Sequence, residues 1–427
     1  METIILGSGI AGISAGYHLK QDGINAVIYE KDSDWGGLCG NFTIDGFRFD
    51  RFVHFTFTDD PYIKGIFEKS SPLYDHPSFS SNYYKGYWLK HPAQNNLAPL
   101  STDEKVKIIC DFVNRPHKNI DELESYEDWL RVQYGNYFAE NFPFKYTRKY
   151  WGLEPNQLET KWVGNRMHSP DLSEVLKGAF ETQDETFYYT KYMRYPKKGG
   201  FRSILNDCRE GLDIRFNKEV VRIDSNNKIV YFKDGSSVNY DRLISSVPLP
   251  EIVDMIDGCP DEVKIAGHNL HNTCGYMVSL GFRRSDVPKY LWFYIYDEDI
   301  LSSRVYSPSM KSLDNVPEGC SSLQAEIFFD CKADIPDKET VLNNTIKKLV
   351  KMGLFKEEEI VVKDIRFEKY ANVTFDKNIY KNRQIVLDYL KTVDIESIGR
   401  FGKWEYFWTF QAFEDGLKCA KEKSLIK

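Results

Sequence analysis

The first thirty residues place the strongest constraint on the fold. A strand-like apolar run at residues 4–6 is followed by Gly7, Gly9 and Gly12, an apolar helical run, a second strand-like run and then Glu30. In this order the first glycine permits a tight turn, the second lets the backbone approach a pyrophosphate, and the third lets the helix pack closely on the strand. The N–H groups at the helix start then face the phosphates. The pattern therefore predicts a βαβ unit that binds a dinucleotide, with Glu30 accepting hydrogen bonds from the adenosine ribose.

A second glycine turn indicates which dinucleotide is bound. Gly36 and Gly37 follow Glu30 after a short loop. Flavoproteins often place such a turn against the phosphates and ribitol of FAD, whereas a flexible loop is the alternative interpretation. We therefore predict a Rossmann-like domain that binds FAD rather than NAD.

Composition excludes several classes of protein. The formal net charge is −7, so the overall field attracts neither nucleic acid nor an anionic membrane. The eight cysteines are scattered without a CxxC pair, which indicates reduced thiols and a cytoplasmic location. No run approaches the roughly 20 apolar residues that span a bilayer, and the N-terminus lacks the pattern of a cleavable signal. Aromatic residues make up 15% of the chain, more than a core alone leads us to expect, so some should line a site for a flat ligand.

The expected secondary structure changes several times along the rest of the chain. Ser/Thr starts followed by acidic residues predict helices after residues 100 and 124. Short alternating strands with turn signals occupy residues 211–250 and are expected to rejoin the first sheet. Strands, with one helix near residues 339–352, occupy residues 270–370 and indicate an antiparallel sheet. A last helix is expected from about Gln411.

These helix and strand patterns predict an α/β fold in which a Rossmann-like FAD-binding domain carries an inserted helical subdomain and an antiparallel-sheet substrate domain. The predicted segments, in chain order, are a first FAD-binding part at 1–90, a helical insertion at 91–188, a second FAD-binding part at 189–250, the substrate domain at 251–370 and a C-terminal FAD-binding part at 371–427.

Six further motifs occur in order along the chain: GFRFDRFVHFTFTDD, YWLKHPAQNNLAPL, WVGNRMHSPDL, MRYPKKGGF, LWFYIYDEDILSSRVYS and GRFGKWEYFWTFQ. Together with the glycine fingerprint they resemble the UDP-galactopyranose mutases, particularly their eukaryotic-type branch, and more broadly the flavoprotein clan that includes amine oxidases. The resemblance runs over nearly the whole chain.

The resemblance implies roles for residues around the cofactor. It places His54 over the flavin and Arg400 in a C-terminal loop that binds the flavin. It also adds Val221 and Gln411 to the residues that hold FAD.

The resemblance also implies a substrate site. Gln94 matches a glutamine that contacts the uracil base, and Arg166 and Arg304 match two arginines that bind the diphosphate and stabilise it as a leaving group. His54 joins the two arginines as a catalytic residue. The other residues implied to bind the substrate are aromatic: Trp292, Tyr294, Tyr370 and Tyr406.

Some positions depart from the motifs of that family. Phe52 and Val53 stand where the family has small glycines, Ala93 replaces a phenylalanine, His91 replaces an aromatic residue, and Phe410 replaces an asparagine.

The implied activity is a non-redox use of reduced FAD. The N5 atom of the flavin displaces UDP from the anomeric carbon of a UDP-sugar. The ring of the bound sugar then opens and recloses through the 4-hydroxyl rather than the 5-hydroxyl, and UDP returns. This interconverts UDP-galactopyranose and UDP-galactofuranose, or a related UDP-hexose, for polysaccharide biosynthesis. An external reductant, such as NAD(P)H, would keep the flavin reduced. The chain has no recognisable nucleophile–base pair and no metal-binding motif, which suits an enzyme whose cofactor carries the chemistry.

Two alternatives stay open at the level of sequence. One is a redox flavoenzyme of the amine oxidase or desaturase type, and the other is a non-catalytic protein that binds FAD or a nucleotide. For each single residue there is also a plain structural interpretation, since an arbitrary arginine is more often a surface ion-pair partner and an arbitrary aromatic residue more often belongs to a core.

Overall fold

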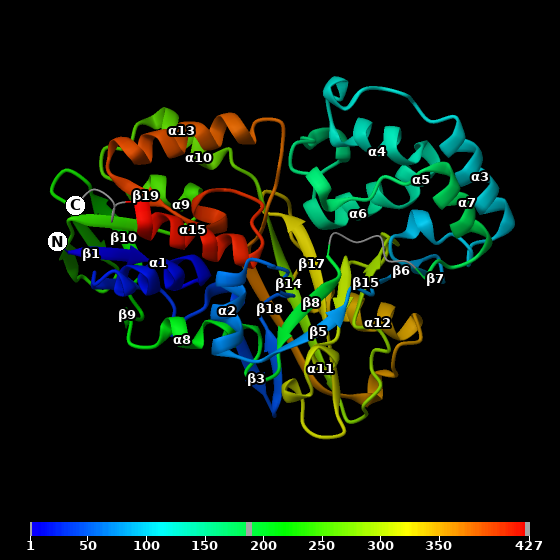
Figure 1. Cartoon of the computed structure of the whole chain (residues 1–427), viewed down its shortest axis with the longest axis horizontal. Coiled ribbons are helices and arrows are strands. Elements are labelled where there is room, and N and C mark those ends of the chain that lie inside the picture. The colour runs from blue at the N-terminus through cyan, green and yellow to red at the C-terminus, as the bar shows by residue number, and fades with distance from the viewer. Residues whose placement is uncertain (1, 185–189, 423–427) are drawn as a thin grey trace.

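A five-stranded parallel sheet forms one part of the molecule. The structure is a computed structural model that describes residues 2–184 and 190–422 (Figure 1). The strand order is β19-β13-β1-β2-β9, and every pairing is parallel. The strands are β1 (Thr3–Leu6), β2 (Ala26–Tyr29), β9 (Asp213–Arg215), β13 (Arg242–Ser245) and β19 (Ile395–Ser397). All four residues of β1 are buried, as expected for a parallel sheet covered on both faces.

Helices from opposite ends of the chain cover this sheet. Helix α1 (Ile10–Gln21) packs along the terminal helix α15 (Thr409–Glu422), and Figure 1 shows the two side by side in blue and red. Helix α13 (Ile379–Thr392) packs against the edge strand β19, and α9 (Leu249–Met255) and α10 (Asp261–His268) pack against α13. The predicted βαβ unit is therefore confirmed, and the terminal helix begins two residues before Gln411.

The strands predicted at residues 211–250 divide between two sheets. β9 and β13 join the parallel sheet as expected, but three strands form a separate antiparallel sheet: β10 (Val220–Asp224), β11 (Ile229–Phe232) and β12 (Ser237–Asn239). The expectation that they rejoin the first sheet was wrong because their tight turns, one of them with Gly235 at φ 84°, close hairpins. Parallel pairing would need a longer crossover connection.

A seven-stranded sheet forms the second layer of strands, in the order β18-β14-β17-β16-β15-β6-β7. Its strands are β6 (Ser81–Tyr84), β7 (Tyr87–Lys90), β14 (Asn272–Phe282), β15 (Trp292–Ile295), β16 (Arg304–Tyr306), β17 (Ser321–Asp330) and β18 (Ile360–Val373), and α12 (Lys338–Lys351) packs against it. The strands β6 and β7 lie within residues 1–90, yet they pair here, and β6 meets β15 in parallel. The segment boundaries stay a prediction, and the one between residues 188 and 189 lies outside the described residues.

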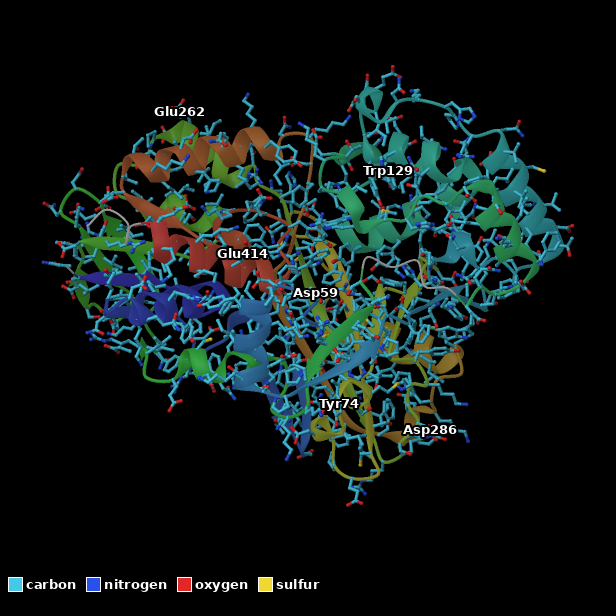
Figure 2. All side chains as sticks on the ribbon, viewed as in Figure 1. Asp59, Tyr74, Trp129, Glu262, Asp286 and Glu414 are labelled. Atoms are coloured by element: carbon cyan, nitrogen blue, oxygen red, sulfur yellow. The ribbon has the colours of Figure 1, made fainter. Side chains whose placement is uncertain are left out.

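The helical insertion forms a lobe, cyan to green in Figure 1, beside the seven-stranded sheet. Its helices are α3 (Thr102–Val113), α4 (Tyr126–Tyr134), α5 (Asn136–Asn141), α6 (Pro143–Trp151) and α7 (Leu172–Phe180). The hydroxyl of Ser101 caps α3, and that of Ser125 caps α4, so both predicted helix starts are confirmed. Figure 2 shows Trp129 inside this lobe, while Glu262 and Asp286 project from the molecular surface elsewhere.

The remaining elements connect these layers: β3 (Asn41–Ile44), β4 (Phe47–Asp50), α2 (Pro61–Ser70), β5 (Leu73–Pro77), β8 (Tyr192–Pro196), α8 (Asn206–Arg209), α11 (Pro308–Lys311) and α14 (Gly399–Gly402). The predicted α/β class is confirmed. Among the helices that the structure describes, none is long and apolar enough to cross a membrane.

Candidate active site

A cavity of about 1180 Å³ opens at the carboxyl end of the five-stranded sheet. Its walls come from the loop after β1, from the seven-stranded sheet and from helix α6 of the helical lobe. Ligands bind at this end of parallel sheets because the loops that follow the strands converge there. The predicted cofactor residues Gly7, Gly9, Glu30, Gly36 and Gly37 all line the cavity.

Glu30 is held in place at the nucleotide end of the cavity. The backbone N–H and the hydroxyl of Ser8 both donate to its Oε2 at 2.7 Å, and the N–H of Asp32 donates to its Oε1 at 3.0 Å. The second glycine turn closes on the first, because the N–H of Gly36 donates to the carbonyl of Ser8 at 2.9 Å. The two glycine motifs and the carboxylate therefore form one continuous wall.

The glycine cradle fits the diphosphate of a dinucleotide. Gly9 caps α1 without any side-chain acceptor for the N–H groups of the first turn. A Cβ atom built on Gly9 meets no atom within 4 Å, so its backbone borders open space, whereas one on Gly12 lies 2.0 Å from the carbonyl oxygen of Gly7. Gly12 thus permits close packing, as predicted, and Gly9 leaves room for an anion at the helix start.

The loop after β4 carries His54 into the cavity. Its ring stacks on Phe201 with the centroids 5.0 Å apart, and Nδ1 lies 2.9 Å from the carbonyl oxygen of Phe52. Since a carbonyl only accepts, Nδ1 carries the proton and donates, which leaves Nε2 as an acceptor. Burial lowers the pKa of His54 to about 4. His54 is therefore neutral at physiological pH.

We expect the two cavity histidines to make the apoprotein sensitive to acid. Burial lowers the pKa of His91, as of His54, to about 4, while both titrate near 6.5 in an unfolded chain. Between these values the folded state binds fewer protons, so the free energy of unfolding falls as the pH drops from 6.5 to 4, by about 2 kcal/mol after allowing for cavity water. Urea unfolding across this range measures the loss. An equal pH dependence in a His54→Phe/His91→Phe double variant would contradict the assignment.

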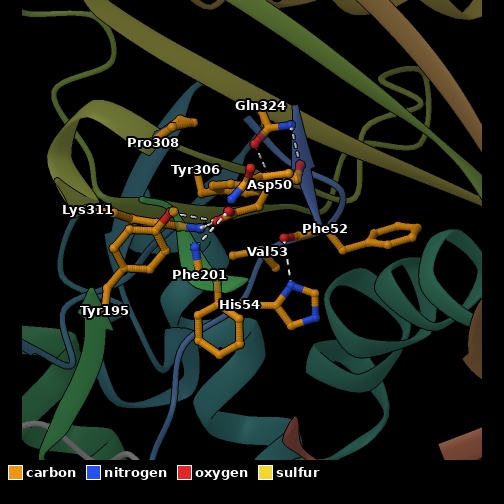
Figure 3. A network of polar contacts seen from close by, with 12 residues as sticks. Asp50, Phe52, Val53, His54, Tyr195, Phe201, Tyr306, Pro308, Lys311 and Gln324 are labelled. Atoms are coloured by element: carbon orange, nitrogen blue, oxygen red, sulfur yellow. Dashed lines mark hydrogen bonds and ion pairs between the residues drawn. The ribbon is translucent and has the colours of Figure 1, made fainter. Parts of the chain in front are cut away.

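A buried charged pair fixes the start of this loop (Figure 3). The Oδ2 of Asp50 accepts hydrogen bonds from the Tyr195 hydroxyl at 2.8 Å and from Lys311 Nζ at 3.2 Å, and Oδ1 accepts the N–H of Phe201 at 3.0 Å. Both ionic side chains are almost completely buried. The amide of Gln324 donates to the Asp50 carbonyl at 3.0 Å. The end of β4, and with it the entry to the His54 loop, is therefore held from several sides.

Breaking this pair should destabilise the fold strongly. Asp50→Asn leaves the Lys311 charge buried without its carboxylate, which should lower the free energy of unfolding by about 3 kcal/mol in urea titrations. A Lys311→Met/Asp50→Asn double variant removes both charges and should recover part of that loss. If the loss in the double variant equals the sum of the losses in Asp50→Asn and Lys311→Met, the two side chains stabilise the fold independently.

Three arginine side chains converge at the other end of the cavity. The guanidinium carbon of Arg166 lies 4.7 Å from the ring centroid of Tyr406, and that of Arg400 lies 5.0 Å from the same ring. The guanidinium carbon of Arg304 lies 5.4 Å from the ring of Trp292. Burial, and then the charges of the other two arginines, lower the pKa of Arg400. The sequence predicted these positions singly, and the structure brings them together.

The arginine cluster has few internal partners. In the part of the chain that the structure describes, Arg304 pairs with Glu326, whereas Arg166 and Arg400 make no ion pair. Arg166 instead donates to the carbonyls of Trp162 and Tyr406, and its buried Nε has no hydrogen-bond partner among the described residues. Excess guanidinium charge around a cavity suits a diphosphate, which accepts bidentate hydrogen bonds.

Sequence reasoning missed Tyr150 of α6. Its hydroxyl lies 3.4 Å from the hydroxyl of Tyr406 and 3.2 Å from Asn372 Oδ1, and the Arg304 guanidinium lies 5.2 Å from its ring centroid. The only signal was its spacing of four residues from Tyr146, which also lines the cavity. That spacing equally describes a helix face packed in a core.

Four predicted residues lie apart from this cluster. Gln94 is outside the cavity wall and donates to the carbonyl of His168 at 3.2 Å. Tyr370 lines the cavity, but its ring packs on Phe401, and burial raises its pKa.

The other two are Val221 and Gln411. Val221 is 47% exposed, and Val220 lines the cavity instead, because neighbouring residues of a strand face opposite sides. Gln411 Oε1 accepts the N–H of Trp408 at 2.8 Å and caps the start of α15, outside the cavity wall.

Trp292 and Tyr294, which are predicted to bind the substrate, line the cavity. Trp292 stacks on Phe55 with ring centroids 5.9 Å apart, and the ring centroids of Tyr294 and His91 lie 5.0 Å apart. Many of the aromatic residues in this aromatic-rich chain therefore form the wall of the cavity.

Comparison with known proteins places this site in a family. Two curated relatives match short stretches: the "inactive all-trans-retinol 13,14-reductase" of Danio rerio is 42% identical over 50 residues, and a 4,4'-diapophytoene desaturase of Staphylococcus haemolyticus is 32% identical over 75 residues. These matches cover 12% and 18% of this chain and span only 8% and 15% of the relatives' own length.

A crystal structure of reduced UDP-galactopyranose mutase superposes with a TM-score of 0.94 at 24% identity, covering 100% of this chain and 96% of that one. At this identity the likeness establishes a shared fold. The sequence profile of the flavin containing amine oxidoreductases matches residues 10–380, which is most of the chain. The chain therefore belongs to the flavin containing amine oxidoreductase family, and its cofactor is a flavin.

Proposed function

We propose that the chain is a FAD-dependent mutase that interconverts UDP-galactopyranose and UDP-galactofuranose, or a related pair of UDP-hexoses. The observation that carries the proposal is the convergence of Arg166, Arg304 and Arg400 beside Trp292 and Tyr406 in the same cavity as the dinucleotide cradle. A diphosphate and a sugar match this combination of cations and flat aromatic walls. The fold shared with reduced UDP-galactopyranose mutase supports it.

The side chains around the cavity suit defined tasks in this reaction. A reduced flavin, when bound, supplies its N5 atom as the nucleophile for the anomeric carbon. Arg166 and Arg304 neutralise the charge that develops on UDP as it leaves and hold it close for its return. The hydroxyls of Tyr150 and Tyr406 donate to phosphate oxygens, and Trp292 offers the sugar a flat apolar wall.

His54 has a different task, because it stays neutral. With Nδ1–H donated to the Phe52 carbonyl, its Nε2 presents an acceptor to the cavity. A neutral acceptor orients a flavin N–H or a sugar hydroxyl without adding charge.

The proposal further includes an external reductant such as NAD(P)H, a cytoplasmic setting and a role in polysaccharide biosynthesis.

The rival function is a redox flavoenzyme. One curated relative is named as a desaturase, whereas the other is named as an inactive reductase, so only the desaturase favours this rival. Polyenes are apolar, however, and such a substrate would leave the guanidinium groups of Arg166 and Arg400 in the cavity wall without a compensating charge. The arginine cluster therefore favours the sugar nucleotide. A non-catalytic binding protein is the third candidate.

One assay separates the three candidates. The purified holoenzyme, reduced with dithionite under anaerobic conditions, is incubated with UDP-galactofuranose, and the products are resolved by chromatography. We expect UDP-galactopyranose to form with reduced enzyme and not with oxidised enzyme. In a parallel incubation of the oxidised holoenzyme, net flavin reduction by an apolar or amine substrate would support the redox enzyme. FAD binding without either reaction would support the binding protein.

A further inference from the structure

One buried carboxylate links the two halves of the cavity. Glu326 lies on β17 directly across from Arg304 on β16, and no part of its side chain is exposed. Its Oε2 accepts a hydrogen bond from Arg304 Nε, and its Oε1 accepts the backbone N–H of Val53 at 3.0 Å. Each oxygen therefore holds a different segment of the cavity wall.

The segment held by Oε1 is the loop that carries His54. Figure 3 shows its entry fixed at Asp50, whose carbonyl accepts the amide of Gln324, a residue on the same face of β17 as Glu326. Within the loop, Phe52 stacks on Phe328 of β17 with centroids 6.1 Å apart. The loop and Arg304 thus rest on one strand, and Glu326 forms a hydrogen bond with each of them.

The bond to Oε2 also sets the direction of the Arg304 guanidinium. Because Nε is engaged by Glu326, the Nη1–Nη2 edge points away from the strand, and neither nitrogen bonds to a residue that the structure describes. That edge is the fork that binds two phosphate oxygens at once. The carboxylate also offsets one positive charge in a wall that holds three guanidinium groups.

We propose that Glu326 is a positioning residue that sets Arg304 and the His54 loop in register, so that the diphosphate and the flavin edge are held at a fixed separation. The proposal rests on the function proposed above, because it assumes that Arg304 binds the diphosphate of a UDP-sugar. Glu326 itself touches neither ligand and acts through its two partners.

The test measures UDP binding to the reduced holoenzyme by calorimetry under anaerobic conditions. Glu326→Gln keeps the size of the side chain but loses its charge, and it should weaken UDP binding by about tenfold. In an Arg304→Lys background the same change should alter the affinity by less than about twofold, since lysine has no Nε–H to position. Ser322→Ala is the matched control, because Ser322 is a buried residue on the same face of β17 whose hydroxyl has no hydrogen-bond partner among the described residues.

A second measurement reports on the loop. Removing a buried negative charge beside Val53 should shift the flavin midpoint potential of Glu326→Gln to a more positive value, because the reduced flavin carries more negative charge, and Ser322→Ala should leave the potential unchanged. Glu326→Asp keeps the charge but is too short to reach both partners, so it should weaken UDP binding with a smaller shift in potential. This variant serves if Glu326→Gln fails to fold.

The outcomes separate the two proposals. Equal weakening of UDP binding in the wild-type and Arg304→Lys backgrounds, or no weakening in either, overturns the positioning role of Glu326 while leaving the mutase intact. If the wild-type holoenzyme fails to bind UDP, the proposed function fails. In that case the positioning of a diphosphate by Glu326 fails as well, and the potential of Glu326→Gln then reports only the electrostatic effect of the carboxylate on the flavin.

Discussion

Replacing Arg304 with alanine is expected to lower the rate of UDP-sugar interconversion by about 10³-fold while FAD stays bound, because one charged donor to the leaving diphosphate is lost from a site shielded from water. The Arg304 side chain is only 15% exposed, so water can replace it poorly. Turnover is measured with chemically reduced enzyme under anaerobic conditions, and the FAD content is read from the visible absorbance. Near-normal turnover would remove Arg304 from the mechanism.

Two variants make that result specific. Arg304→Lys keeps a positive charge but loses both the planar fork and the bond to Glu326, so its turnover should fall by about 10²-fold, between wild type and alanine. Arg222→Ala is the control for loss of an arginine elsewhere, since Arg222 pairs with Asp257 at the surface and lies outside the cavity wall. Its turnover should match that of the wild type.

The start of the fold was predictable because its signals are local. The strand at residues 3–6, the helix from residue 10 and the strand at residues 26–29 each follow from periodicity and glycine placement within a few residues. The helix starts at Ser101 and Ser125 are likewise set by side chains that cap the backbone a few positions on.

The pairing of distant strands was not predictable in this way. Strand β6 joins the seven-stranded sheet through Ser81 opposite Phe293, a partner more than two hundred residues away that no local pattern specifies. The different placement of Val221 has a related cause. A shift of one residue along a strand moves the predicted contact to the opposite face, so Val220 meets the cavity in its place.

The family motifs led to part of the site, whereas residues that no motif names were overlooked. His54, Arg166, Arg304 and Arg400 were placed by motif and meet in one cavity. Glu326 was overlooked, although the run SLQAEIFF sets a lone carboxylate in a strand of apolar residues. A charge at such a position is rarely left without a partner, and that is the signal that identifies it.

Two of the three fingerprint glycines, Gly9 and Gly12, should respond to alanine in different ways. In Gly12→Ala the new methyl group would lie 2.0 Å from the Gly7 carbonyl, so α1 and β1 must separate. We expect the free energy of unfolding of the apoprotein to fall by about 3 kcal/mol, which outweighs the gain of about 1 kcal/mol from alanine in a helix. Thermal or urea unfolding of FAD-free protein measures this loss.

Gly9→Ala should leave the apoprotein as stable as the wild type and yet weaken the binding of FAD. Gly9 has φ −68°, which any residue adopts, and its Cβ would meet no protein atom within 4 Å, so the folded chain has no reason to reject a methyl group. The open space that accepts the methyl is the space into which the pyrophosphate must come against the backbone. We expect FAD affinity to fall by about 100-fold in fluorescence titrations of apoprotein, the equivalent of about 3 kcal/mol. Undiminished affinity would mean that the pyrophosphate lies elsewhere, whereas a loss of apoprotein stability would mean that Gly9 serves the fold as Gly12 does.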